Sequence, residues 1–185
     1  PRFAVRPYPK EWERKITLKD GTAILVRPVR PEDEPLYGPF FAAVDEQDLR
    51  LRFFAPIKTF SHAFVARFTQ LDYARAMAFI AIEQASGQML GVARLHANAN
   101  YDSAEYAVLI RSGLKGKGLG WLLMQMIIEY AGSEGIPQIE GQVLRDNATM
   151  LRMCVELGFS INPDPDDSDT YVVKLPVTDR RPPAP

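Results

Sequence analysis

Leu114-Lys115-Gly116-Lys117-Gly118-Leu119-Gly120 is a glycine-rich turn between two apolar segments of different character. Ahead of it, Tyr106 to Ile110 is typical of a strand; behind it, Trp121 to Ala131 lacks proline and glycine and predicts a helix. A glycine turn at a helix N-terminus presents free backbone N–H groups and the positive end of the helix dipole to an anion. Because Lys115 and Lys117 add positive charge, the turn is a candidate cradle for a phosphate or pyrophosphate.

Two common phosphate-binding motifs do not match this turn. A P-loop needs Gly-Lys followed by Ser or Thr, but Gly116-Lys117 is followed by Gly118. A dinucleotide-binding turn needs a third glycine where this chain has Trp121. The turn instead resembles the Q/R-x-x-G-x-G/A pattern of the GNAT acetyltransferase superfamily, with Lys115 at the Gln/Arg place and Gly120 at the last one. In that superfamily the loop binds the pyrophosphate of acetyl-CoA, whereas an isolated turn of this kind is more simply a flexible cap on a core helix.

Size and composition indicate one globular domain. The chain has 185 residues, and its 46% apolar and 24% charged residues are ordinary for a soluble protein with a substantial core. The formal net charge of -1 favours neither nucleic acid nor a membrane surface, so we expect neither as a partner. One cysteine excludes an intrachain disulfide, and with two histidines it leaves no expected metal site. We expect a cytoplasmic protein, since no apolar run has the length of a membrane span or a signal peptide.

The two ends differ from the middle of the chain. Residues 1–15 are predicted to be a linker from an upstream domain, because prolines alternate there with apolar and basic residues. Residues 178–185 are proline-rich and are predicted to be a disordered tail. Residues 16–177 are predicted to be the folded domain.

Changes of periodicity within that domain predict its elements. Strands are expected at 15–18, 22–29, 77–83, 89–97, 103–111, 138–144, 159–161 and 170–175. Helices are expected at 32–44, 46–54, 61–68, 121–131 and 147–157, with an acidic loop at 162–169. Strands that follow one another without helices suit an α+β fold: a mixed, mainly antiparallel twisted sheet flanked by helices on both faces, as in GNAT proteins.

Glu105 is the candidate general base. The period-two rule places it on one strand face with Ala107 and Leu109, just ahead of the glycine turn. The alternative is a solvated side chain near a strand end. A partly desolvated carboxylate has a raised pKa and accepts a proton near neutral pH. Acetylation of an amine requires such a base, because an ammonium has no free lone pair, and we therefore expect Glu105 to be partly buried. His96, on the preceding strand, is either a groove residue or a hydrogen-bonded sheet histidine.

The last helix holds two further candidates. Asn147 is the expected N-cap, and in GNAT proteins an asparagine at this place also contacts the pantetheine arm. Seven residues later many GNAT proteins carry a tyrosine that protonates the departing CoA thiolate, where this chain has Cys154. A cysteine is a weak acid for this step, and a small buried core residue is the favoured reading. Tyr106, another residue or water remain the alternatives.

Several stretches resemble, more closely, the GNAT domain of bacterial Pat-type protein lysine acetyltransferases, over roughly residues 22–175. They are Leu25-Val26-Arg27-Pro28-Val29-Arg30-Pro31-Glu32-Asp33, Leu51-Arg52-Phe53-Phe54, Leu71-Asp72-Tyr73, Ala76-Met77-Ala78-Phe79, Ala104-Glu105-Tyr106-Ala107-Val108, Asn147-Ala148-Thr149-Met150-Leu151 and Leu157-Gly158-Phe159. The resemblance implies Glu105 as base, with acetyl-CoA as co-substrate and no metal. It implies a pyrophosphate site at Lys115, Gly116, Lys117, Gly118, Leu119 and Gly120, with Asn147 and the backbone of Leu109 and Ile110 on pantetheine.

The same resemblance implies partners. Substrates of the Pat-type family are typically AMP-forming acyl-CoA synthetases, acetylated on a catalytic lysine, and the domain is often joined to an upstream region resembling NDP-forming acyl-CoA synthetases. Two alternatives stay open: a GNAT enzyme acting on a small-molecule amine, and a non-catalytic acyl-CoA-sensing module. The sequence leaves open the protein substrate and its lysine, the acyl chain, the thiolate acid, the oligomeric state and regulation.

Overall fold

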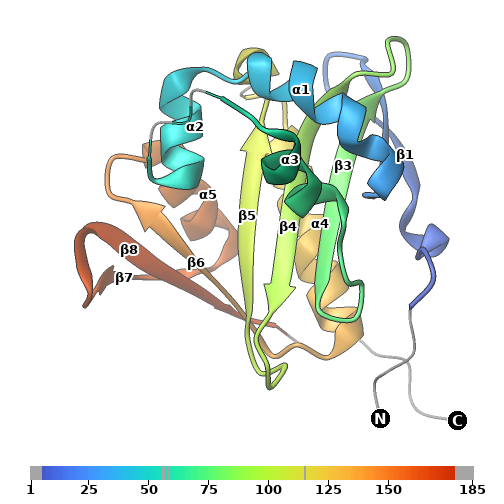
Figure 1. Ribbon diagram of the computed structural model, residues 1–185. Helices are drawn as coiled ribbons and strands as arrows, with labels where there is room; N and C mark the ends of the chain where they lie inside the picture. Colours follow the sequence, from blue (N-terminus) through green and yellow to red (C-terminus); the bar gives the residue numbers. More distant parts are fainter. Residues whose placement is uncertain (1–5, 56, 58, 115, 178–185) are drawn as a thin grey trace, which may run out of the picture.

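The computed structural model describes residues 6–55, 57, 59–114 and 116–177, and one sheet forms its middle layer. The strands are β1 (Arg14–Thr17), β2 (Ala23–Pro28), β3 (Ala76–Glu83), β4 (Met89–Ala97), β5 (Ala104–Ile110), β6 (Gln138–Leu144), β7 (Ser160–Asp164) and β8 (Asp167–Pro176). They form an eight-stranded sheet in the order β1-β2-β3-β4-β5-β6-β8-β7. Every neighbouring pair is antiparallel except β5 and β6, which run parallel (Figure 1).

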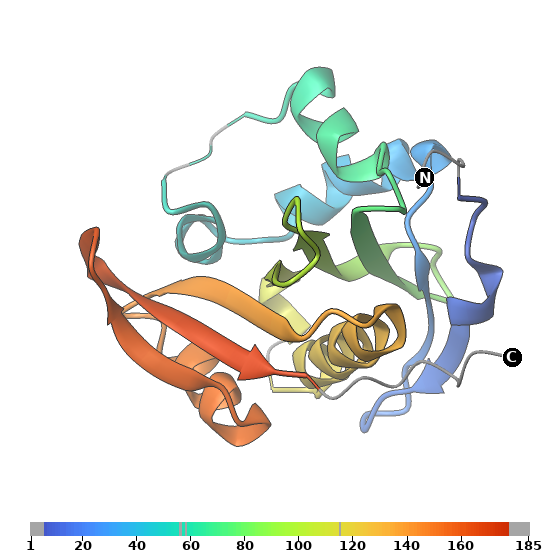
Figure 2. The same ribbon diagram turned by 90° about the horizontal axis from the view of Figure 1, so that it is seen from below.

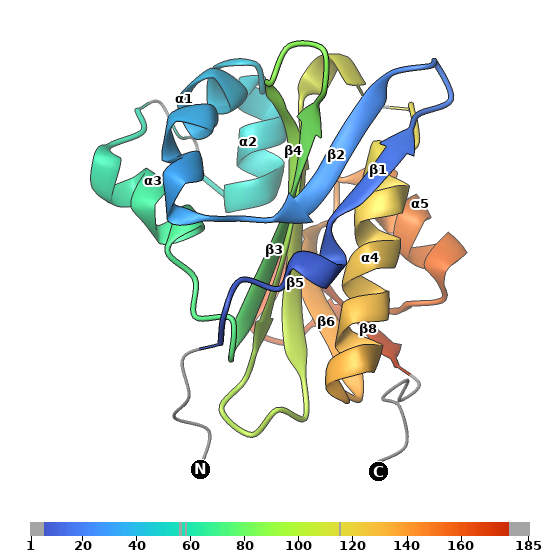
Figure 3. The same cartoon turned by 90° about the vertical axis from the view of Figure 1, so that its right-hand side faces the viewer.

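Helices cover both faces of this sheet. They are α1 (Glu34–Ala42), α2 (Glu46–Phe53), α3 (His62–Thr69), α4 (Leu119–Glu134) and α5 (Ala148–Leu157), with short 3-10 helices at Lys10–Trp12, Pro31–Asp33 and Ser112–Leu114. The first three helices lie on one side of the sheet, and α4 and α5 on the other (Figure 3). The predicted α+β fold, with a mixed and mainly antiparallel sheet flanked by helices on both faces, is confirmed. No helix within the described residues has the length and apolarity needed to cross a membrane.

The central strands are buried from both sides. On β3, Met77 and Phe79 belong to the apolar layer that α4 completes, and Ala78 and Ile80 to the layer under α1 and α3. Their relative exposures are 0–1%, which explains why this strand reads as a continuous apolar run instead of an alternating one. On α4, Leu123 belongs to a stripe of buried residues that runs along one side of the helix.

Strands β5 and β6 pair over a short distance and then separate. The ladder joins Ala104 to Ile139 and Glu105 to Glu140, and no further pair follows. The next residue of β5 is Tyr106, and a Cβ placed on Gly141 of β6 would lie 2.5 Å from Cε1 of its ring. The ring therefore packs over Gly141, directly after the last rung, and needs the missing side chain there. Figures 1 and 2 show β6, β7 and β8 turning away from β5 beyond this point.

Other buried groups hold the Tyr106 ring in place. Its centroid lies 5.6 Å from that of Phe159, and its hydroxyl lies 3.3 Å from the Cys154 sulfur. Tyr106 is 7% exposed and Cys154 0%. Burial raises the pKa of the Cys154 thiol, and the hydrogen bond with Tyr106 only partly opposes the rise. The prediction of Cys154 as a buried core residue is confirmed.

Two predicted boundaries are wrong. The acidic loop expected at 162–169 is a hairpin, because Asp164 accepts hydrogen bonds from Asp166 N at 2.9 Å and from Thr170 Oγ1 at 3.0 Å and so turns the chain within two residues. The helix expected at 121–131 begins at Leu119 and extends to Glu134, between Gly118 and Gly135, which have φ values of 87° and 70°.

The folded unit also starts earlier than residue 16. Trp12 packs on Phe79 and Tyr130 with ring centroids 5.7 and 5.3 Å away, and β1 begins at Arg14. The end of the expected linker is therefore part of the domain. The rest of that prediction, at residues 1–5, and the predicted tail at 178–185 lie outside the described residues.

Replacing Gly141 with alanine should test the contact that separates the strands. The new methyl group would overlap the Tyr106 ring, which is packed on its other side, so we expect Gly141→Ala to lower the free energy of unfolding by about 1–3 kcal/mol. Urea unfolding followed by circular dichroism would measure it. Gly38→Ala in α1 is the matched control, because its Cβ meets nothing within 4 Å; equal midpoints for the two variants would contradict the prediction.

Cys154 should resist alkylation in the folded protein. Its thiol is buried and its pKa is raised, so the reactive thiolate is scarce and inaccessible. We expect iodoacetamide at neutral pH to label Cys154 only after unfolding in guanidinium chloride, as read by intact-protein mass spectrometry. Rapid labelling without denaturant would show that the packing around Tyr106 opens readily.

Candidate active site

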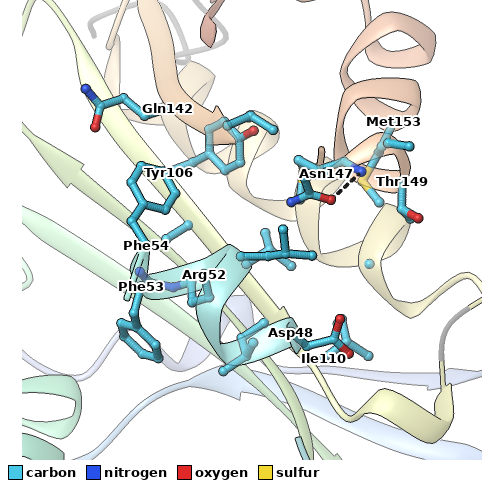
Figure 4. A pocket seen from close by; sticks show the side chains of 18 of the residues that line it. Asp48, Arg52, Phe53, Phe54, Tyr106, Ile110, Gln142, Asn147, Thr149 and Met153 are labelled. Carbon is cyan, nitrogen blue, oxygen red and sulfur yellow. Dashed lines mark hydrogen bonds between the residues drawn. The ribbon is translucent and has the colours of Figure 1, made fainter. Parts of the chain in front are cut away.

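A cavity of about 480 Å³ lies in the gap between β5 and β6. One wall is β5 from Glu105 to Ile110, and α2 covers it from the side of the first three helices. At its far end lie Gly120, in the first turn of α4, and Asn147, at the start of α5 (Figure 4). The site is thus the direct consequence of the separation of the two strands.

The wall formed by β5 offers free backbone groups. On one edge, Leu109 and Ile110 pair with Val92 and Gly91 of β4. On the edge that faces β6, the ladder ends at Glu105, so the later residues of β5 have backbone N–H and C=O groups without a strand partner there. Such an edge can pair with an extended amide-containing chain.

The glycine turn adopts a conformation that requires glycine. Gly116 and Gly118 have φ values of 83° and 87°, in the left-handed region. Gly118 is the N-cap of α4 and supplies no side-chain hydrogen bond, so the first N–H groups of the helix have no side-chain cap. A Cβ on Gly120 would lie 3.2 Å from the Met153 methyl group, so its lack of a side chain keeps α4 and α5 close.

The structure separates the predicted pyrophosphate residues into groups. Gly120 lines the cavity, whereas Leu119 is 1% exposed and packs in the core. The Lys117 ammonium donates to Asp20 Oδ2 at 3.0 Å, on the loop between β1 and β2, and so is directed away from the cavity. Lys115 lies outside the described residues.

Asn147 caps α5 as expected. Its side-chain oxygen accepts a hydrogen bond from Met150 N at 3.2 Å, drawn as a dashed line in Figure 4. The amide nitrogen of the same side chain has no partner among the described residues, and Asn147 lines the cavity. One oxygen thus completes the helix start while the NH₂ group is available to a ligand.

Glu105 lies where two cavities meet. It lines the cavity between β5 and β6 and also a second one of about 590 Å³, bounded by β6 and the β7–β8 hairpin. Acidic side chains are frequent in this second cavity, where Glu140, Asp164 and Asp166 join Glu105 and only Lys174 is basic. A group held at Glu105 can therefore be reached from two sides.

The expected partial burial of Glu105 is wrong, because its side chain is exposed. It occupies the last paired rung, beside the gap, with His96 opposite it on β4 and Glu140 on β6. His96 is also exposed and makes no hydrogen bond to the described residues, so it is not a hydrogen-bonded sheet histidine. It lies beside Glu105 on the same face of the sheet.

Tyr106 and Cys154 differ in their access to the cavity. Tyr106 lines it, while Cys154 is fully buried behind the ring. Burial, reinforced by the Cys154 neighbour, raises the pKa of the Tyr106 hydroxyl, which therefore stays protonated. Of the two side chains considered as acid, only Tyr106 lines the cavity.

Sequence reasoning missed Arg52. This residue of α2 is half-buried and lines the same cavity as Glu105 (Figure 4). Burial lowers its pKa to about 10; the nearby charge of Arg94 acts in the same direction and that of Glu105 opposes it. Its position in a short, largely polar helix carries no signal for a place in this cavity, because the contact of α2 with β5 depends on the fold. No group of three or more metal-binding side chains occurs among the described residues.

Comparison with known proteins gives consistent matches. The family model described as "Acetyltransferase (GNAT) domain" matches residues 23–160. "Acetyltransferase PA5475" of Pseudomonas aeruginosa is 32% identical over 161 residues, which is 86% of this chain and 87% of that protein. "Acetyltransferase Pat" of Mycolicibacterium smegmatis is 27% identical over 77% of this chain, which spans only 43% of that longer protein.

Among solved structures, the GNAT domain of S. lividans PAT superposes with a TM-score of 0.85. The two are 26% identical, and the match covers 92% of this chain and all of that domain. The match of the family model over most of the chain, with a relative of similar length, shows that the chain belongs to the GNAT acetyltransferase family.

Proposed function

We propose that this chain transfers an acetyl group from acetyl-CoA to a lysine side chain of a protein, with Glu105 as the general base. The observation that carries the proposal is the place of Glu105 at the junction of two cavities, one bounded by the α4 N-terminus and Asn147, the other acidic. The first suits an elongated co-substrate and the second a cationic acceptor.

Acetyl-CoA would lie in the gap between the strands. Its pantetheine amides would pair with the free β5 edge at Leu109 and Ile110 and with the Asn147 amide. The pyrophosphate would meet the uncapped N–H groups of α4 and the glycine turn, including Lys115, Gly116, Gly118 and Leu119. Lys117 would contribute only if its ammonium group left Asp20 and bound a phosphate oxygen instead.

The acceptor lysine would enter through the acidic cavity. Glu140, Asp164 and Asp166 favour an ammonium group there, and Glu105 removes one proton from it. The neutral amine attacks the thioester carbonyl, the C–S bond of the tetrahedral adduct breaks, and the nitrogen loses its second proton to water as the amide forms. The sulfur leaves with its electron pair and gains a proton from Tyr106 or from water.

The nature of the acceptor rests on the Pat-like relatives. The match to the GNAT domain of S. lividans PAT supports a protein substrate, and we propose an AMP-forming acyl-CoA synthetase in the cytoplasm. An upstream acyl-CoA-synthetase-like domain is part of the same proposal, on the ground of the sequence resemblance described above. Nucleic acid and membrane have no place in it, given a formal net charge of -1.

Removing the base should slow transfer to a synthetase acceptor. We expect Glu105→Gln to lower kcat by about 10²–10⁴-fold, the usual contribution of positioned base catalysis. CoA release would be followed with a thiol reagent, and the acetylated lysine would be identified by mass spectrometry.

Glu140→Gln is the matched control, because it removes a neighbouring carboxylate at the same rung. We expect it to raise the KM of the acceptor while kcat is retained. Equal losses of kcat in both variants would contradict a specific role for Glu105. Tight acetyl-CoA binding without transfer to any protein would favour a small-amine acceptor, and failure with small amines as well would favour a sensor.

Two substitutions at Asn147 should separate its structural role from its role in binding. Asn147→Asp keeps an acceptor for Met150 N and hence the helix cap, but loses the NH₂ donor. We expect it to unfold at the same temperature as the wild type and to raise the KM of acetyl-CoA about tenfold. Asn147→Ala should also lower the free energy of unfolding by about 1 kcal/mol. An unchanged KM in Asn147→Asp would assign the residue to the cap alone.

A further inference from the structure

Three phenylalanine rings on α2 and α3 form one cluster beside the active site. The ring centroids of Phe64 and Phe68 lie 5.1 Å apart, and Phe53 lies 5.7 Å from Phe64 and 6.1 Å from Phe68. All three pairs have edge-to-face geometry, which is favourable for aromatic contacts. The cluster thus joins the end of α2 to one face of α3.

Each of these rings makes a cation–π contact with the guanidinium group of a different arginine. Arg52 lies 4.6 Å from the centroid of Phe53, Arg67 5.3 Å from Phe64, and Arg94 4.8 Å from Phe68. The arginines come from α2, α3 and β4, which are distant in sequence. Stacking on a ring fixes a guanidinium plane and leaves its N–H groups directed outward. We name Arg52, Arg67 and Arg94 the arginine cluster.

The arginine cluster forms no ion pair with a carboxylate of the described residues. None of its three side chains takes part in an ion pair or a hydrogen bond there, whereas Arg6, Arg14, Arg27, Arg30 and Arg50 all pair with acids. Arg67 is exposed and the other two are half-buried. Burial also lowers the pKa of Arg94, as it does that of Arg52. Arg52 and Arg94 are two half-buried like charges, and the charge of Glu105, which acts on Arg52 without forming an ion pair with it, compensates them only in part. An anion would therefore lower the free energy of the fold.

A buried hydroxyl beside the cluster is also unsatisfied. Tyr37 of α1 is 0% exposed, and its hydroxyl oxygen has no hydrogen-bond partner. Burial raises the pKa of Tyr37, and the positive charges of Arg94 and Arg52 oppose the rise. The Tyr37 O–H group therefore lies in the electrostatic field of the Arg94 and Arg52 guanidinium groups. It finds no hydrogen-bond acceptor among the described residues.

The arginine cluster lies on the same side of the sheet as Glu105. Arg52 lines a cavity with Glu105, and Arg94 is two residues before His96, the cross-strand neighbour of Glu105. Beyond Glu105, toward β6 and the β7–β8 hairpin, the surface is acidic. The charge therefore changes sign across the catalytic position.

We propose that the arginine cluster binds acidic side chains of the acceptor protein next to the lysine that is acetylated; this inference rests on the proposed function. Arg67 and Arg94 do not line the cavity between β5 and β6, so a carboxylate on the acyl group would meet Arg52 alone. Three guanidinium groups on three separate rings match a segment with more than one acidic residue. The acidic cavity on the other side of Glu105 would repel the backbone of a nucleic acid.

Two short peptides would test this proposal. Each has a single lysine, flanked by aspartates in one peptide and by asparagines in the other. We expect the wild type to acetylate the acidic peptide with a kcat/KM about five- to tenfold higher, through KM, as expected for about 1 kcal/mol of charge interaction. Arg67→Glu, an exposed position that should fold normally, should abolish the preference, and Arg67→Lys should keep most of it.

Arg75→Glu is the matched control, because Arg75 is likewise exposed and lies 5.9 Å from the ring of Tyr101, outside the cluster. It should retain the preference. Equal use of both peptides by the wild type, or a preference that survives Arg67→Glu, would overturn the inference. So would an Arg52-dependent preference for succinyl-CoA over acetyl-CoA, which would assign the charge to the acyl group.

Fluorescence anisotropy of the same peptides separates this proposal from the proposed function. Tighter binding of the acidic peptide, lost in Arg67→Glu, supports the arginine cluster even if neither peptide is acetylated. If the acidic peptide binds in this way but is not acetylated, the proposed acetyltransferase function is contradicted and the proposed role of the arginine cluster stands. Equal binding of both peptides would overturn the inference whatever the activity.

Discussion

The approach of the Tyr106 ring to Gly141 is the constraint on which the rest of this structure depends. No side chain fits at residue 141 while the ring is there, because a Cβ would lie 2.5 Å from it. At this same place the ladder between β5 and β6 ends at Glu105, which leaves a free strand edge, opens the cavity and puts the carboxylate at its mouth. Parallel strands that separate in this way create a binding site from backbone alone.

This geometry also explains why Glu105 is exposed. The residue belongs to the last paired rung, so its side chain is left uncovered by the described residues on the side of the gap. Any desolvation of the carboxylate during catalysis must therefore come from the two substrates themselves. Co-substrate and acceptor would enclose it from the two cavities, and base catalysis would be strongest only when both are bound.

Local signals predicted much of the fold, including the glycine turn and the helix cap that border the cavity. The glycines at 116 and 118, the N-cap Asn147 and the strand from Met89 to Ala97 follow from turn, capping and period-two rules, which depend on neighbours in sequence. The same rules failed at residues 162–169, where two prolines and several aspartates suggested a loop. The edge position of β7 tolerates Pro163, and Asp164 closes the turn, which only the tertiary structure reveals.

The acceptor side could not be predicted for a physical reason. A cofactor with a pyrophosphate and an amide chain is bound by main-chain groups, and main-chain geometry leaves a mark in the glycine pattern. An acceptor is recognised by side chains, and here these come from α2, α3 and β4 on one side and from β6 and the β7–β8 hairpin on the other. Arginines such as Arg52, Arg67 and Arg94 look like ordinary solvated charges until folding places them together without an ion pair to a described carboxylate. Membership of the GNAT family therefore accounts for acetyl transfer, while on the proposals made here the acceptor is selected by this distribution of charge around Glu105.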